Sequence, residues 1–170
     1  MAGVATYFKE KKPEMVIVGV QAEGCSTFIP SREAHQPVTL TKSSTIAEGI
    51  SAKRMGDMTF AICDRLVDHA VTVSDEEISE GILWCLENER LFVEGCGGAS
   101  LAAALKYKDL FSGPTVVLLS GGNLDVNLLA RIIERGLVKV GRLLHLVFTI
   151  PDIPGSLHKL LETFAAERAS

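Results

Sequence analysis

The 170-residue sequence lacks an apolar run of about 18 residues, a signal-peptide pattern and a long block of one charge. A membrane span needs about 20 consecutive apolar residues, and a secretory leader needs a basic start followed by an apolar stretch, so we expect neither. The densest basic cluster, Lys9, Lys11 and Lys12, is diluted by Glu10 and Glu14, and 17 basic against 21 acidic residues give a net charge of −4. Because nucleic-acid binding requires clustered Lys and Arg, nucleic acid is not an expected partner.

Cysteine and histidine are scarce, with four residues of each, and their spacing carries no ligand pattern. There is no CxxC pair, and no histidine stands in a triad-like pattern with Ser or Cys, so neither a zinc site nor a nucleophilic triad is indicated. A P-loop and a GxGxxG motif are also missing, which argues against a nucleotide-binding fold. We expect a cytoplasmic protein whose four cysteines are reduced and mostly buried. These are Cys25, Cys63, Cys85 and Cys96.

The composition is globular, 47% hydrophobic and 22% charged, and helical and strand patterns alternate along the chain. Residue periodicity predicts helices over 2–12, 24–34 with a break near Pro30, 58–67, 74–90, 95–104, 125–135 and 156–166. Continuous apolar runs predict buried strands over 15–21 and 114–119, and further strands are expected over 70–73 and 142–150. This alternation favours an α/β fold with a mostly parallel sheet.

Local signals refine this outline. Ser74 and Glu77 form the pattern of a capping box at the start of a helix. Gly136 is expected to end the helix that precedes it. Residues 36–57, rich in Pro, Ser and Gly, form a long loop of the kind that more often carries function than not.

Three glycine-bearing turns are the candidate places for chemistry. The turn at 120–123, Ser-Gly-Gly-Asn, follows a predicted strand and precedes a helix, at the sheet edge where ligands of α/β proteins bind. Its glycines allow close backbone approach and its hydroxyl can hydrogen-bond a ligand, although a plain strand-to-helix turn has the same pattern. In the turn at 94–98, Glu94 is favoured as a helix cap over a ligand contact. The turn at 45–50 has less support as the wall of a pocket.

Seven stretches in order along the chain carry a family resemblance: A-G-V-A-T-Y-F-K at 2–9, V-I-V-G-V-Q-A-E-G at 16–24, S-T-I-A-E-G-I at 44–50, V-T-V-S-D-E-E-I at 71–78, V-E-G-C-G-G-A-S-L-A-A-A-L at 93–105, L-S-G-G-N-L-D-V-N-L-L at 119–129 and R-I-I-E-R-G-L-V-K-V-G-R at 131–142. Together they resemble the carboxyl-terminal part of threonine dehydratase (threonine ammonia-lyase), a pyridoxal-phosphate enzyme of the tryptophan-synthase β-like fold (fold type II). The resemblance implies that residues 1–141 are the carboxyl-terminal part of the catalytic domain. Residues 142–170 resemble an incomplete ACT-like regulatory segment, one strand and one helix, with an effector turn at Asp152, Pro154 and Gly155.

In that family, pyridoxal 5′-phosphate supplies the electron sink for β-elimination of L-threonine to 2-oxobutanoate and ammonia, a reaction of isoleucine biosynthesis. L-Serine is a further expected substrate. The cofactor-binding residues that the resemblance implies are Ser120, Gly121, Glu48, Gly49, Glu94 and Gly95. Ser120 would hydrogen-bond the pyridine nitrogen of the cofactor. The metal-binding carboxylate of some relatives falls at Gln21, so no divalent ion is expected.

The resemblance also implies what this chain does not supply. The family's Schiff-base lysine lies upstream of the residues present, so we expect a fragment with no catalytic residue, no covalent cofactor binding and no activity alone. Missing strands would leave unpaired sheet edges, from which we expect self-association. The alternative is a non-catalytic interaction or amino-acid-binding module that uses the turn at 152–157.

Overall fold

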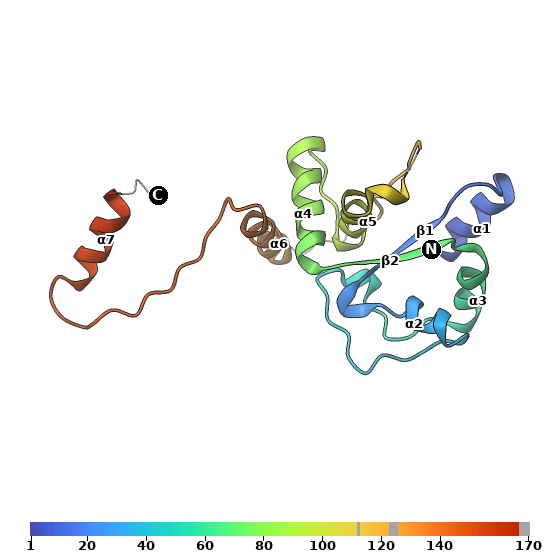
Figure 1. Ribbon diagram of the computed structural model, residues 1–170, viewed down its shortest axis with the longest axis horizontal. Helices are drawn as coiled ribbons and strands as arrows, with labels where there is room; N and C mark the ends of the chain where they lie inside the picture. The colour runs from blue at the N-terminus through green and yellow to red at the C-terminus, as the bar shows by residue number, and fades with distance from the viewer. Residues whose placement is uncertain (112, 123–125, 167–170) are drawn as a thin grey trace.

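Two parallel strands and seven α-helices make up this computed structural model, which describes residues 1–111, 113–122 and 126–166 (Figure 1). Strand β1 (Val18–Ala22) pairs with β2 (His69–Val73), with Val18 opposite His69 and Ala22 opposite Val73. The helices are α1 (Ala2–Lys11), α2 (Phe28–Glu33), α3 (Asp57–Leu66), α4 (Asp75–Trp84), α5 (Gly95–Lys106), α6 (Val126–Lys139) and α7 (Ser156–Ala166). Short helical turns occupy Glu23–Cys25, Glu48–Ile50, Cys85–Glu89 and Lys108–Leu110. The α/β class with a parallel sheet is confirmed.

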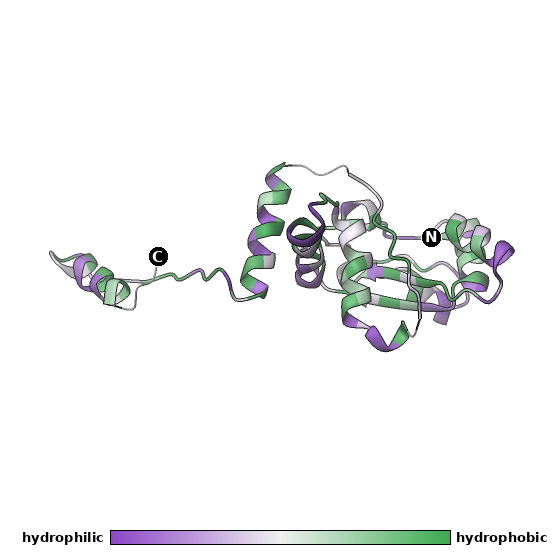
Figure 2. Ribbon diagram, turned by 90° about the horizontal axis from the view of Figure 1, so that it is seen from above, coloured by the Kyte–Doolittle hydropathy of each residue, from purple (hydrophilic) through white to green (hydrophobic). Residues whose placement is uncertain are grey.

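The buried side chains form two clusters, which correspond to the two groups of helices in Figure 1. One cluster joins the strands to α4, α5 and α6 and contains Ile78, Ile82 and Ile132, each at most 2% exposed. The other joins α1, α2 and α3 around Phe28 and Phe60, whose ring centroids lie 6.5 Å apart. Figure 2 shows hydrophobic residues along the strands and the helices that pack on them. Because burying one such side chain stabilises a fold by about 1.5–3 kcal/mol, the first cluster fixes the α4–α5 pair that bears the candidate site.

Glycines let the helices of the first cluster approach closely. A methyl group on Gly81 of α4 would lie 2.6 Å from the Gly98 carbonyl oxygen of α5. On the other side of α4, a methyl group on Gly136 of α6 would lie 3.0 Å from the Ser79 carbonyl oxygen. Gly81 therefore needs to be glycine because backbone occupies the space beside it, whereas a methyl group on Gly136 would also press on the Leu83 side chain at 3.2 Å.

Two predicted helix boundaries are wrong. Helix α6 continues past Gly136 to Lys139, because Gly136 lies where α6 packs against α4. The helix ends just before Gly141, which adopts φ +71°. There the Arg142 N–H donates to the Leu137 carbonyl at 2.8 Å, as in a Schellman motif. Pro30 does not interrupt α2, because it lies in the first helical turn, where a missing N–H costs no helical hydrogen bond.

Two of the four predicted strands are not strands in the described part of the chain. Residues 114–119 and 142–150 form no ladder with a neighbour, and Val116 and Val147 are 90% and 96% exposed. An apolar run becomes a buried strand only where another strand accepts its hydrogen bonds and helices cover its faces. Here β1 and β2 pair with each other, and the described residues add no third strand to their sheet.

The self-association that we expect from unpaired sheet edges remains a prediction.

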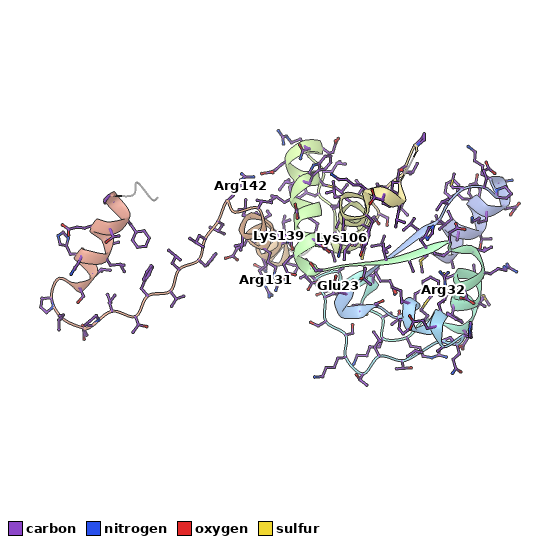
Figure 3. All side chains as sticks on the ribbon, viewed as in Figure 1. Glu23, Arg32, Lys106, Arg131, Lys139 and Arg142 are labelled. Atoms are coloured by element: carbon purple, nitrogen blue, oxygen red, sulfur yellow. The ribbon has the colours of Figure 1, made fainter. Side chains whose placement is uncertain are left out.

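The capping box at the start of α4 is confirmed. The Glu77 N–H donates to Ser74 Oγ at 3.2 Å, and the Ser74 N–H donates to Glu77 Oε2 at 2.8 Å. Lys106 of α5 adds an ion pair to the same carboxylate at 2.9 Å and approaches Glu23 at 3.4 Å (Figure 3). Burial by itself would raise the pKa of Glu77, but the hydrogen bonds from Lys106 and from the Ser74 N–H outweigh it and lower this pKa.

This carboxylate gives folding a defined pH dependence. Because the folded pKa of Glu77 lies below its unfolded value of about 4.3, its contribution is fully present above that pH and is lost as the pH falls through the lowered folded pKa. We expect Glu77→Gln, which keeps a capping-box side chain but cannot titrate, to cost about 1 kcal/mol at pH 7 and to lose less stability than the wild type on acidification. Urea unfolding followed by circular dichroism at pH 7 and pH 3 measures both differences. Equal losses on acidification in the two proteins would contradict the assignment.

The carboxyl-terminal segment stands apart from the rest of the chain. Figure 1 shows α7 separated from the other helices by the extended residues 142–155. The rings of Phe148 and Phe164 pack edge to face at 5.6 Å, and no residue of α7 within 156–166 is buried. The predicted helix at 156–166 is confirmed, whereas the predicted strand before it is not formed. Over the described residues, every helix falls short of the length or the apolar character that a bilayer crossing requires.

Candidate functional site

The three glycine-bearing turns meet at the first turn of α5. A methyl group on Gly95 would lie 2.6 Å from Ala47 Cα, so the 45–50 loop rests directly on this end of the helix. A methyl group on Gly97 would lie 3.2 Å from the Ser120 carbonyl oxygen. The 45–50 and 119–121 segments, about 45 and 25 residues from the start of α5 in the sequence, therefore lie in one small region. Glycine backbone forms much of this region.

The Glu94 side chain lies beside two of these turns. A methyl group on Gly121 would overlap Glu94 Oε1, and one on Gly49 would lie 3.6 Å from the same oxygen. Although Glu94 is the N-cap residue of α5, its side chain makes no capping hydrogen bond. The favoured cap interpretation is therefore wrong, because the carboxylate is turned toward the glycine turns and away from the helix N–H groups.

Cys96 lies beneath the 48–50 turn. A methyl group on Gly49 would lie 2.7 Å from Cys96 Sγ, so this turn packs directly against the sulfur. Burial raises the pKa of the Cys96 thiol, and the hydrogen-bonded Glu94 carboxylate raises it further. Because the thiolate is the reactive form of cysteine, this raised pKa lowers the nucleophilicity of Cys96. All four cysteines are free, and Cys25, Cys63 and Cys85 are buried, as expected.

Ser120 and Gly121 form the outer side of this region. Ser120 is exposed at the end of the extended 114–119 segment, and Gly121 has φ +90°, a conformation that side-chain-bearing residues rarely adopt. The structure thus brings Gly49, Glu94, Gly95 and Gly121 together with Ser120 beside them. Asn123, the last residue of this turn, lies outside the described residues.

Glu48 and the proposed effector turn do not take part directly in this arrangement. Glu48 is exposed on the short helical turn that contains Gly49, and it shares the region through that turn. The proposed effector turn at Asp152, Pro154 and Gly155 lies exposed in the carboxyl-terminal segment, just before α7. This turn is separated from the three glycine-bearing turns by the extended residues that precede it, and the regulatory and amino-acid-binding interpretations stay predictions.

Asp75 is a residue that the sequence patterns did not single out. Its Oδ1 accepts a hydrogen bond from Thr45 Oγ1 at 2.6 Å and one from the Ile46 N–H at 3.2 Å. In the sequence, Asp75 is one of several acidic residues that suit the start of α4. Thr45 lies 30 positions away from it. No local spacing rule could have found the contact.

Gln21 is fully engaged within the protein. Its amide oxygen accepts from the Phe28 N–H at 2.8 Å and from Ser26 Oγ at 3.2 Å, and its amide nitrogen donates to Thr27 Oγ1 at 3.1 Å. These bonds order the turn between β1 and α2. Over the described residues, no group of three His, Cys, Asp or Glu side chains is placed to hold a metal ion.

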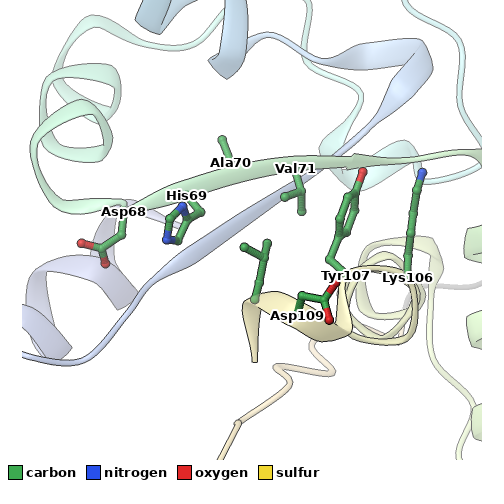
Figure 4. A pocket seen from close by; sticks show the side chains of 8 residues that line it. Asp68, His69, Ala70, Val71, Lys106, Tyr107 and Asp109 are labelled. Atoms are coloured by element: carbon green, nitrogen blue, oxygen red, sulfur yellow. The ribbon is translucent and has the colours of Figure 1, made fainter. Parts of the chain in front are cut away.

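A groove of about 520 Å³ lies at the other end of α5, between the start of β2 and residues 106–110 (Figure 4). Its lysine, Lys106, is held by Glu77, and this hydrogen bond raises the pKa of the ammonium group well above its usual range. At 1.5 Å per helical residue, Lys106 lies about 16 Å from Gly95. A firmly protonated amine at that distance cannot act on a molecule bound at the three turns.

Comparison with known proteins points to one family. Residues 1–122 match the family model described as pyridoxal-phosphate dependent enzyme. The chain is 37% identical over 161 residues to the L-threonine ammonia-lyase of Thermotoga maritima, covering 95% of this chain and 40% of that protein. It is 40% identical over 172 residues to the L-threonine ammonia-lyase of Geobacter sulfurreducens, covering 100% of this chain and 42% of that protein. The chain thus spans about two fifths of the length of these relatives.

Solved structures agree with this match. The processed form of threonine deaminase isoform 2 from Solanum lycopersicum superposes with a TM-score of 0.73 at 31% identity, covering 79% of this chain and 40% of that one. Maize serine racemase superposes with a TM-score of 0.70 at 32% identity, covering 76% of this chain and 42% of that one.

Proposed function

The chain belongs to the pyridoxal-phosphate dependent enzymes, and from this we propose that it forms the ring-binding part of a threonine ammonia-lyase. The observation that carries the proposal is the convergence of the turns at 47–49, 94–97 and 119–121, with the exposed Ser120 beside them. Threonine is the proposed substrate, and L-serine, which has the same β-hydroxyl, is a second one. Residues 1–141 would belong to the catalytic domain.

The residues present fit this cofactor. A flat pyridine ring needs walls without projecting side chains, and the region is bounded by the backbone of Gly49, Gly95 and Gly121. A ring nitrogen needs one hydrogen-bonding partner, which the hydroxyl of Ser120 can supply. A methyl group would collide with Cys96 Sγ at Gly49, with Ala47 Cα at Gly95 and with the Glu94 carboxylate at Gly121, so the present packing requires glycine at all three positions.

When bound, the cofactor supplies the electron sink for loss of the α-proton and departure of the β-hydroxyl. The chain's own part is binding and orientation. Ser120 would hold the ring nitrogen with a neutral hydroxyl, which does not force that nitrogen to stay protonated as a carboxylate would. The 48–49 turn would cover one side of the ring, and Glu94 would fix the position of this turn relative to Gly121.

The proposal assigns the covalent step to another part of the enzyme. The resemblance puts the lysine that holds the cofactor in this family outside these 170 residues, and Lys106, which is paired with Glu77, would not replace it. By themselves these residues would bind pyridoxal 5′-phosphate without a covalent bond and would release no 2-oxobutanoate from threonine. Turnover of threonine by the isolated chain would overturn this assignment.

Ser120 provides the direct test. We expect Ser120→Ala to weaken pyridoxal 5′-phosphate binding by about fivefold, which is the loss of one hydrogen bond, and Ser156→Ala in the carboxyl-terminal segment to leave it unchanged. Ser120→Asp is expected to raise the pH at which the bound ring nitrogen loses its proton, because a carboxylate stabilises the protonated form. Equilibrium dialysis measures the affinities, and absorbance against pH measures the second effect. Equal affinity in the wild type and Ser120→Ala would contradict the proposed site.

A further inference from the structure

We propose that Asp75 is a positioning residue of this site. It holds residues 45–47 and thereby keeps the 48–50 turn, with Gly49, packed on the first turn of α5; the 48–50 turn is called the Gly49 wall below. The inference rests on the proposed function, because the wall matters only if a cofactor binds beside it. Asp75 itself touches none of the residues that would contact the ring. It would act through Thr45 and the backbone that follows.

The hydrogen bonds at Asp75 leave the loop a single arrangement. Thr45 Oγ1 accepts the Ala47 N–H at 3.1 Å, so its one proton must be donated elsewhere. The Thr45 hydroxyl donates this hydrogen bond to Asp75 Oδ1 at 2.6 Å, and the same oxygen also accepts one from the Ile46 N–H at 3.2 Å. Hydrogen bonds to an ionised acceptor are about twice as strong as neutral ones, so the carboxylate fixes both the hydroxyl and the backbone of the loop.

The same loop carries the Gly49 wall. Ala47 is fully buried against Gly95, and its carbonyl accepts the Ile50 N–H at 3.0 Å to form the short helical turn at 48–50. That turn covers the thiol of Cys96. Release of Thr45 and Ile46 would therefore loosen Ala47 and uncover the sulfur.

Glu76 offers a matched control. Asp75 and Glu76 are neighbours in the first turn of α4, and both face the same guanidinium of Arg135, at 3.9 Å and 3.8 Å. Both carboxylates also suit the positive end of the helix dipole. Glu76 is exposed, and only Asp75 accepts the hydrogen bonds from Thr45 and Ile46 among the described residues, so the two residues differ chiefly in these bonds.

The reactivity of the Cys96 thiol measures loop release without any cofactor. The other three cysteines are buried, so the fast phase of labelling with 5,5′-dithiobis(2-nitrobenzoate) reports Cys96. We expect Asp75→Ala to label about tenfold faster than the wild type, and Glu76→Ala to label at the wild-type rate. Asp75→Asn keeps an acceptor oxygen but loses the charge that strengthens these hydrogen bonds, so its labelling rate should lie between those of the wild type and Asp75→Ala. A structural role through charge alone would instead make Asn and Ala at position 75 equally fast.

A second variant keeps the test decisive if Asp75→Ala unfolds, which circular dichroism would reveal. Thr45→Val removes the hydroxyl and leaves α4 untouched, and we expect it to speed Cys96 labelling about as much as Asp75→Ala. Unchanged labelling in Thr45→Val and in a folded Asp75→Ala would overturn the inference. Faster labelling with unchanged pyridoxal 5′-phosphate affinity would support the role of Asp75 in holding the loop and would overturn the proposed cofactor site.

Discussion

Gly121→Ala is expected to weaken pyridoxal 5′-phosphate binding by tenfold or more, whereas Gly122→Ala should leave the affinity within about twofold of the wild type. Gly121 has φ +90°, and an alanine forced into such a conformation costs about 1–3 kcal/mol. The added methyl group would also overlap the Glu94 carboxylate. Either the turn or Glu94 must move, and both belong to the proposed wall of the site.

Gly122 is the matched control because it is the next residue in the same turn. A methyl group there meets nothing within 4 Å, and its φ is not in the positive range. Equilibrium dialysis with the two variants and the wild type gives the affinities directly. If Gly121→Ala bound the cofactor as well as Gly122→Ala does, the turn at 119–121 would not be part of the site.

Gly81→Ala is expected to destabilise the fold by about 2 kcal/mol, while Gly3→Ala should stabilise it by up to about 1 kcal/mol. Both glycines lie within helices, where alanine is intrinsically the better helix former. The difference comes from their surroundings. The methyl group on Gly81 would lie 2.6 Å from the Gly98 carbonyl oxygen and 3.2 Å from the Ala102 backbone nitrogen, whereas the one on Gly3 meets nothing within 4 Å.

The opposite signs make this pair informative. Helices α4 and α5 would have to separate to accommodate Gly81→Ala, and this would loosen the end of α5 on which the three turns rest. Urea unfolding followed by circular dichroism gives both free energies. A Gly81→Ala protein as stable as the wild type would show that the close α4–α5 approach does not contribute to stability.

The helices could be predicted well because their signals are local. The capping box at Ser74 and Glu77 lies within four residues, and its two hydrogen bonds form as the pattern predicts. The predicted helix at 156–166 has the observed bounds of α7. Where prediction failed, at Gly136, the same residue type serves either to end a helix or to let one pack closely, and only the presence of α4 beside it decides which.

Sequence by itself determined the helical segments, the parallel α/β class and the family, because hydrogen bonds within a helix and residue periodicity span only a few positions. It also located the three glycine-bearing turns one by one. The tertiary structure decided that these turns meet at α5, that Glu94 faces Gly121 without capping its helix, and that Asp75 holds Thr45 from 30 positions away. It also left the apolar residues 114–119 unpaired, because a strand depends on a neighbour that its own residues cannot specify.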